Sequence, residues 1–174
     1  LTGTDKLIQC ADGLVPVPDT VLDPALAFAD GRKIPRVVHV TSKSRCMTKE
    51  FAENVDKWRF KDHSLFMHDD DAMDELLNRH WPEFPQLQQV QKCLKYGGAV
   101  KADIWRALIL YEYGGIYTDT DNAPNKFNGT TIQPEDDASF VVEVIGIPSQ
   151  WFMAISPRQP LMHMLIETIL HNIP

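Results

Sequence analysis

Two aspartates, Asp119 and Asp121, directly follow residues 116–118, a short apolar segment with the composition of a buried strand. Side chains alternate along an extended chain, so we expect both carboxylates on one side of it, roughly 7 Å apart. Such a pair suits a hard divalent cation, Mn²⁺ or Mg²⁺, that bridges phosphate oxygens. Alone it is weak evidence, because Asp69 and Asp71 repeat the pattern and a solvated aspartate turn is the alternative.

A second pair, Asp103 and Arg106, lies three residues apart on the helix predicted over residues 100–113. By itself it would be a surface ion pair worth under about 1 kcal/mol. The glycines at 114–115 predict a left-handed end to this helix, after which the chain returns as the strand that carries Asp119. We expect this return to bring Asp103 and Arg106 beside the aspartate pair, where a guanidinium can bind a diphosphate and a carboxylate can accept from sugar hydroxyls.

The elements that must position these residues alternate between strands and helices. After an irregular arm over residues 1–33, we predict strands over 37–40, 64–67, 116–118, 140–145 and 152–155. We predict helices after Thr48, over 100–113 and over 160–171, and one more that is capped by Asp71. This alternation predicts an α/β sheet, at least partly parallel, with a ligand crevice at the carboxyl ends of its strands.

Composition excludes several classes of protein. The chain has 174 residues with 24 acidic and 17 basic side chains, and its net charge of −7 argues against binding to nucleic acid through the phosphate backbone. No apolar run reaches the 18 or so residues of a membrane span. The sequence lacks a P-loop, a dinucleotide-binding glycine motif and a serine nucleophile elbow, so the corresponding enzyme classes lose their main support.

Features outside these motifs concern the cellular compartment. The chain begins with Leu1, so we expect a trimmed start with any signal or anchor upstream. The cysteines show no metal-type spacing, and we expect buried or free thiols with at most one disulfide among Cys10, Cys46 and Cys93. The sequon that begins at Asn128 fits a loop of a secretory-pathway protein.

The joint pattern is more specific than either pair. It reads Asp103-x2-Arg106-x3-Leu110-x3-Gly114-Gly115-x-Tyr117-x-Asp119-x-Asp121. This pattern resembles the sugar-binding region of the DXD glycosyltransferases of family 32, which include α-1,6-mannosyltransferases of fungal outer-chain glycans. Residues 34–39 are similar to the opening strand of that family, residues 152–154 are similar to a later strand, and the resemblance extends over about residues 34–170.

The resemblance implies an α/β fold of the GT-A type for nucleotide-diphospho-sugar transferases, with a Rossmann-like mixed, mainly parallel sheet flanked by helices. It also implies a nucleotide-sugar donor, a divalent metal, Mn²⁺ or Mg²⁺, and transfer with retention of anomeric configuration. The domain would extend over residues 34–174. It would be incomplete at its C-terminal end, because relatives complete the metal and diphosphate site beyond the last helix seen here.

The resemblance assigns a role to each matching residue. Asp121 binds the metal, and Asp119 faces the ribose and sugar and also contacts the metal. Asp103 and Arg106 hold the donor sugar and its phosphate and are the expected catalytic residues. The remaining donor-binding positions are His39 and Thr41, at the end of the first strand where the base packs, and Tyr117.

The predicted function is therefore a metal-dependent retaining glycosyltransferase that moves a hexose onto a glycan acceptor. Mannose from GDP-mannose is favoured, and UDP-galactose or UDP-glucose are the other donors. The resemblance implies the Golgi or secretory-pathway lumen, with a membrane anchor in the full-length protein. Two alternatives stay open: a non-catalytic module that binds sugar nucleotides or glycans, and a metal-dependent phosphoesterase that uses the same aspartate pair.

Overall fold

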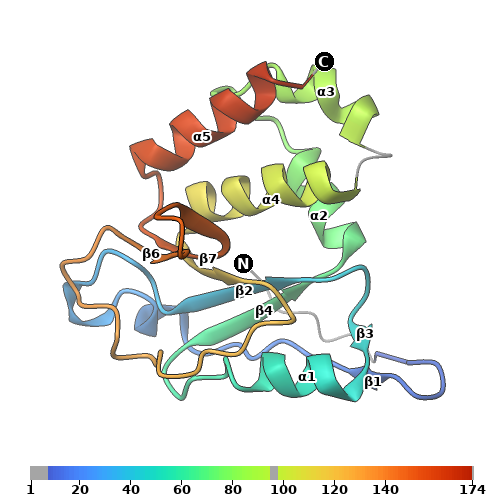
Figure 1. Ribbon diagram of the computed structural model, residues 1–174, viewed down its shortest axis with the longest axis vertical. Helices are drawn as coiled ribbons and strands as arrows, with labels where there is room; N and C mark the ends of the chain where they lie inside the picture. Colours follow the sequence, from blue (N-terminus) through green and yellow to red (C-terminus); the bar gives the residue numbers. More distant parts are fainter. Residues whose placement is uncertain (1–7, 95–97, 174) are drawn as a thin grey trace.

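Five strands form the central sheet of the computed structural model, which describes residues 8–94 and 98–173 (Figure 1). They are β2 (Val37–Thr41), β4 (Ser64–His68), β5 (Gly115–Thr118), β6 (Ala138–Val142) and β7 (Pro148–Ile155), in the spatial order β4-β2-β5-β7-β6. Strands β4, β2 and β5 are parallel, and β7 is antiparallel to both β5 and β6. The predicted α/β class with a mixed sheet is thus confirmed.

Helices cover both faces of this sheet. They are α1 (Lys49–Asp56), α2 (Asp70–Leu77), α3 (Leu87–Leu94), α4 (Gly98–Tyr113) and α5 (Pro160–His171). Figure 1 shows α2, α3, α4 and α5 on one side of the sheet and α1 on the other. Among the described residues, none of these helices is long and apolar enough to span a membrane.

The parallel strands β2, β4 and β5 are buried on both faces, as is usual for parallel strands between helices, whereas β6 at the edge of the sheet is partly exposed. Val38 and Val40 of β2 belong to the core on the α1 side. In β5, Ile116 belongs to that same core, whereas Tyr117 packs into the core on the α4 side. The alternation of side chains along each strand therefore divides the molecule into two cores that share one sheet.

Helix α4 is the central helix. Its buried residues lie all around its axis, because it packs between the sheet and the helices α2 and α5. It ends as predicted: Gly114 and Gly115 have φ angles of 63° and 99°. Space also requires glycine, since a Cβ at Gly114 would lie 2.8 Å from the Ile155 carbonyl oxygen and one at Gly115 would lie 2.6 Å from that of Val37.

The described part of the N-terminal arm packs against the domain. It contains short 3₁₀ turns (Pro24–Leu26 and Ala29–Gly31) and a two-residue strand, β1 (Val15–Pro16), that pairs with β3 (Cys46–Met47). Val17 is only 1% exposed. A disulfide joins Cys10 to Cys46, in agreement with the expectation of at most one disulfide, whereas the side chain of Cys93 lies outside the described part.

Two local predictions differ from the structure, and one helix was missed. Asp69, not Asp71, caps α2, because its side chain accepts a hydrogen bond from the Ala72 amide at 3.0 Å. The strand predicted over 140–145 ends at Val142, since the chain reverses there and the Glu143 amide donates to the Ile147 carbonyl at 2.9 Å. The short helix α3, which follows a turn rich in proline, was not predicted.

Candidate active site

The candidate site lies at the carboxyl ends of three neighbouring strands. Thr41 of β2 pairs with His68 of β4, and Val40 pairs with Thr118 of β5, so the three ends are adjacent. A cavity of about 500 Å³ opens beside them, within the range of small-molecule sites. It is lined by Thr41, Ser42, Lys43, Phe51, Asp70, Met73, Gly98, Ala102, Arg106, Tyr117, Asp119, Thr120 and Asp121.

Both aspartates of the DXD motif line this cavity, but not as an extended pair. Strand β5 ends at Thr118, and the chain turns at Asp121, with the Asn122 amide donating to the Asp119 carbonyl at 3.4 Å. The extended geometry predicted for the two carboxylates is therefore wrong. Asp121 is exposed, and one of its carboxylate oxygens, Oδ1, accepts from the Asn122 side chain at 3.0 Å.

Asp119 is held more tightly than Asp121. The Tyr117 hydroxyl donates to Asp119 Oδ1 at 2.6 Å, and the Asp119 amide donates to the Trp151 carbonyl at 3.1 Å. Burial raises the pKa of Asp119, and the Tyr117 hydroxyl and the Arg106 guanidinium offset this only in part. Burial also raises the pKa of Tyr117 far above its ordinary value, so the phenol keeps its proton and remains the donor.

Arg106 reaches the cavity from α4. Its Nη2 lies 3.1 Å from Asp103 Oδ1, and its Nη1 donates to the backbone and side-chain oxygens of Gln150, both at 3.3 Å. Its guanidinium carbon lies 5.1 Å from the centre of the Tyr117 ring, in cation–π contact. The return of the chain through the glycine pair thus brings Arg106 to the cavity that holds Asp119, as the sequence predicts.

Asp103 is not among the residues that line the cavity. It forms an ion pair with Arg106, which does line it. Its geometry is that of a residue that orients the guanidinium. A direct grip of Asp103 on the donor stays a prediction.

His39 is completely buried and does not line the cavity. Its Nε2 lies 3.0 Å from the Gly114 carbonyl oxygen, which can only accept, so Nδ1 is left to accept from His68 Nε2 at 3.1 Å. Burial lowers the pKa of His39 well below its ordinary value and that of His68 to about 3. The structure therefore places His39 in a neutral histidine pair behind the site.

Thr41, the other residue predicted from β2, does line the cavity, with its hydroxyl 3.0 Å from the His68 carbonyl oxygen. Sequence reasoning missed Lys43 and Phe51. Lys43 could have been found from its position just after the carboxyl end of β2, whereas Phe51 reaches the cavity from α1 and carries no motif signal. Asp70, which also lines the cavity, belongs to an aspartate triplet just after the carboxyl end of β4.

The fit to a divalent metal depends on Asp119 and Asp121. Within residues 8–94 and 98–173, no cluster of three or more His, Cys, Asp or Glu side chains could by itself hold a metal ion. Mg²⁺ is usually bound through one or two carboxylates, with waters and substrate phosphates as its other ligands. Two carboxylates that share a ligand-sized cavity match that arrangement.

The fold and the site define a class of protein, and the family comparison agrees. The family described as "Glycosyltransferase sugar-binding region containing DXD motif" matches residues 40–138, which is more than half of the chain. The chain belongs to this family. The match includes the helix that carries Arg106 and the strand that leads to the aspartate pair, and it favours a glycosyltransferase over a phosphoesterase.

Particular relatives agree with this class. The chain is 27% identical over 158 residues to inositol phosphoceramide mannosyltransferase 1 of Schizosaccharomyces pombe, a match that covers 86% of this chain and 47% of the relative. The chain thus spans about half the length of this curated relative. Among solved structures, the PaToxG glycosyltransferase matches with a TM-score of 0.60 at 17% identity, over 85% of this chain and 65% of that one, and it supports the fold alone.

Proposed function

We propose that this chain carries the donor site of a retaining glycosyltransferase that moves a hexose from a nucleoside-diphosphate sugar to an acceptor hydroxyl. One observation carries the proposal: Arg106, Asp119 and Asp121 reach one cavity from two elements that a glycine turn folds together. A cation beside two carboxylates suits a diphosphate sugar, because the phosphates need positive charge and the sugar hydroxyls need acceptors.

Arg106 has a role that follows from its charge. As the glycosidic bond breaks, negative charge grows on the diphosphate leaving group, and a guanidinium fixed in advance stabilises that charge. Asp103 and Gln150 hold Arg106 in place, so little reorganisation is needed during the reaction. Asp119, fixed by the Tyr117 hydroxyl, is placed to accept from a ribose or sugar hydroxyl.

A divalent metal, Mn²⁺ or Mg²⁺, is part of the proposal. Asp119 and Asp121 would hold it, and when bound it would offset charge on the diphosphate. The exposure of Asp121 supports this role, because an exposed carboxylate on a cavity wall is open to a metal ion that also touches substrate.

We favour GDP-mannose as the donor, with UDP-galactose and UDP-glucose as alternatives. The name of the Schizosaccharomyces pombe relative, a mannosyltransferase, supports mannose. The acceptor hydroxyl would belong to a glycan or, as in the name of that relative, to an inositol phosphoceramide headgroup. We place the protein in the Golgi or secretory-pathway lumen, anchored to the membrane in its full-length form, and the Cys10–Cys46 disulfide supports an oxidising compartment.

Calorimetric titration tests the proposal. GDP, UDP, GDP-mannose and UDP-galactose are titrated into the chain with Mn²⁺ and again with EDTA. We expect one nucleotide to bind only with Mn²⁺ and Asp121→Ala to abolish that binding. Asp71→Asn is the matched control, because Asp71 belongs to the other Asp-x-Asp pair and does not line the cavity. Binding that is unchanged in Asp121→Ala contradicts the assignment of the site.

A non-catalytic binding module is the second candidate, and the short set of metal ligands within the described residues favours it. Transfer assays with radiolabelled donor separate the two functions. Turnover of the donor by this chain supports a transferase. Metal-dependent binding without any turnover supports the module.

A further inference from the structure

We propose that Asn128 is a site of N-linked glycosylation. Asn128-Gly129-Thr130 is the only Asn-x-Ser/Thr sequon among the 174 residues. The proposal is independent of the donor chemistry, and it rests on entry of the chain into the secretory pathway.

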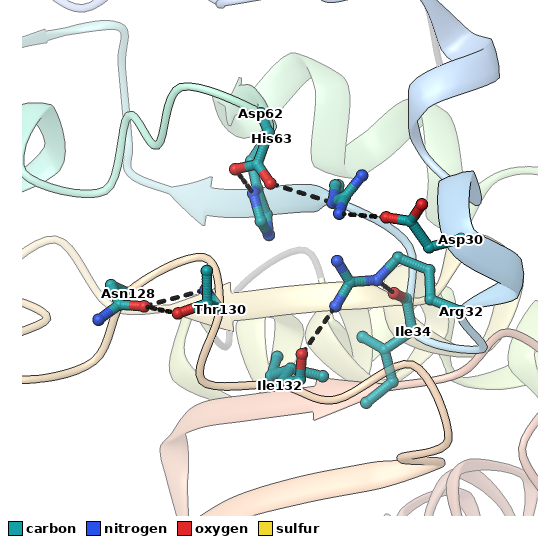
Figure 2. Close-up of polar contacts among 9 residues, drawn as sticks. Asp30, Arg32, Ile34, Asp62, His63, Asn128, Thr130 and Ile132 are labelled. Atoms are coloured by element: carbon teal, nitrogen blue, oxygen red, sulfur yellow. Dashed lines mark hydrogen bonds and ion pairs between the residues drawn. The ribbon is translucent and has the colours of Figure 1, made fainter.

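The loop around the sequon presents Asn128 to solvent. Asn128 and Thr130 are exposed, whereas Gly129 packs inward: a Cβ there would lie 2.9 Å from Asp62 Oδ1 and 3.1 Å from His63 Cε1. A side chain at the middle position would therefore displace the Asp62 carboxylate, whereas glycine packs inward and leaves both of its neighbours facing solvent. Figure 2 shows Asn128 and Thr130 on the loop, with Asp62 and His63 on the neighbouring segment.

Hydrogen bonds to the side-chain oxygen of Asn128 orient its amide group. Its oxygen accepts from the Thr130 hydroxyl at 2.7 Å and from the Thr130 amide at 2.9 Å. Its nitrogen has no hydrogen-bond partner in the described part of the chain, and in Figure 2 it points away from these contacts. The nitrogen that would carry the glycan is thus free while the oxygen is fixed.

The disulfide is a second, independent indication. A bond between Cys10 and Cys46 forms and persists in an oxidising compartment, such as the lumen of the endoplasmic reticulum, and N-linked glycans are added there. It closes a 36-residue separation in the sequence far from the sequon, so the two features are not parts of one local motif.

The sequon lies at the opposite end of the sheet from the cavity. Its neighbours Asp62 and His63 directly precede β4, and Arg32, which donates to the Ile132 carbonyl at 3.1 Å, precedes β2. The loop therefore packs at the amino ends of the parallel strands, whereas the cavity lies at their carboxyl ends. A glycan on Asn128 would leave the cavity open.

The modification requires a polyprenyl-diphosphate-linked oligosaccharide and a host oligosaccharyltransferase. A bond forms between Asn128 Nδ2 and the anomeric carbon of the oligosaccharide. The bond from that carbon to the diphosphate oxygen breaks, the polyprenyl diphosphate leaves with the electron pair, and the amide nitrogen loses one proton. No oxidant or reductant takes part.

The test is expression of the whole chain in yeast behind a cleavable signal peptide. Formation of the Cys10–Cys46 disulfide, detected by alkylation of thiols before and after reduction, shows that the chain has entered the lumen. We expect digestion with PNGase F to increase the mobility of the wild-type chain and mass spectrometry to find deamidation at position 128. Digestion of total cell extract makes the result independent of secretion.

Three variants complete the test. Asn128→Gln and Thr130→Ala are expected to lose the shift, and Thr130→Ser is expected to keep it. Asn125→Gln is the matched control, because Asn125 is an exposed asparagine of the same loop but lies outside any sequon. A disulfide-bonded wild-type chain whose mobility PNGase F does not change overturns the proposal, and so does a shift that survives in Asn128→Gln.

Discussion

The two ends of the parallel strands both carry clusters of charged residues, but the clusters differ in what surrounds them. At the amino end, Arg36 lies between Asp30 and Asp62, at 2.9 and 3.1 Å. Asp62 also accepts from the neighbouring His63 at 2.9 Å (Figure 2). Arg32 is buried against two backbone carbonyls. The charges of this amino-end cluster are paired with other residues of the chain, so the cluster has a structural role.

At the carboxyl end, the same kinds of residue line a cavity. Three carboxylates there face two cations: Asp70, Asp119 and Asp121 against Lys43 and Arg106. Unlike the amino-end cluster, this set has unequal charges, and among the described residues no ion pair holds Asp121. The comparison teaches that charge pairing within the chain, rather than the presence of charge, distinguishes a structural cluster from a ligand site in this fold. Changes at the amino end should therefore reduce stability, and changes at the carboxyl end should reduce function.

The largest expected effect is on stability, at the amino end. Gly115→Ala places a Cβ 2.6 Å from the Val37 carbonyl oxygen at a φ of 99°, so steric clash and backbone strain add. We expect a loss of about 3 kcal/mol in the free energy of unfolding, measured by urea denaturation. Gly13→Ala is the control, because Gly13 has a similar φ of 83° but no atom within 4 Å of the added Cβ. Equal losses in both variants would show that close approach to Val37 is not the cause.

The second effect is on function, at the carboxyl end. Asp121→Ala removes an exposed carboxylate from the cavity wall, and we expect about a 100-fold loss in transfer rate, comparable to the loss of one group that stabilises developing charge in an active site. The urea midpoint should stay within experimental error of that of the wild-type chain. A large fall in stability with normal transfer would reverse the comparison between the two ends.

The third effect depends on pH. Burial lowers the pKa of His39, His63 and His68, so the folded chain keeps them neutral while the unfolded chain protonates them below about pH 6.5. Their contribution to stability is complete above that pH. It is lost as the pH falls toward the folded pKa, which is about 3 for His68. Between the unfolded and folded pKa values, each such histidine lowers the free energy of unfolding by about 1.4 kcal/mol for each unit by which the pH falls.

Urea denaturation between pH 7.5 and 5 measures this slope. His68→Gln keeps a side-chain donor for His39 but cannot titrate, so the slope of its stability against pH should fall by about one proton. His80→Gln, a change at an exposed histidine, serves as the control and should leave the slope unchanged. Parallel slopes for His68→Gln and the wild-type chain would contradict the buried-histidine account.

Much of this arrangement was predictable from the sequence, for physical reasons. Strong apolar periodicity predicted the helix over 100–113, found as Gly98–Tyr113, and the last helix was predicted at its observed bounds, Pro160–His171. The glycine pair predicted the turn that carries Arg106 back to Asp119. Two details were not predictable. Where β5 ends relative to Asp119 depends on pairing with other strands, and in a sheet buried on both faces the period of two does not say whether His39 faces a cavity or a core.

The smallest expected effect comes from a direct comparison of Arg36 at the amino end with Arg106 at the carboxyl end. Arg36→Met keeps the aliphatic stem but removes contacts to Asp30 and Asp62, whose side chains are 69% and 42% exposed, so we expect a loss of less than about 1 kcal/mol. Donor affinity should not change. Arg106→Met, the matched change at the carboxyl end, should reduce donor affinity about tenfold, because the lost cation faces the ligand cavity. Donor affinity is measured by calorimetry. Equal losses of affinity in Arg36→Met and Arg106→Met would contradict the distinction between a structural cluster at the amino end and a ligand site at the carboxyl end.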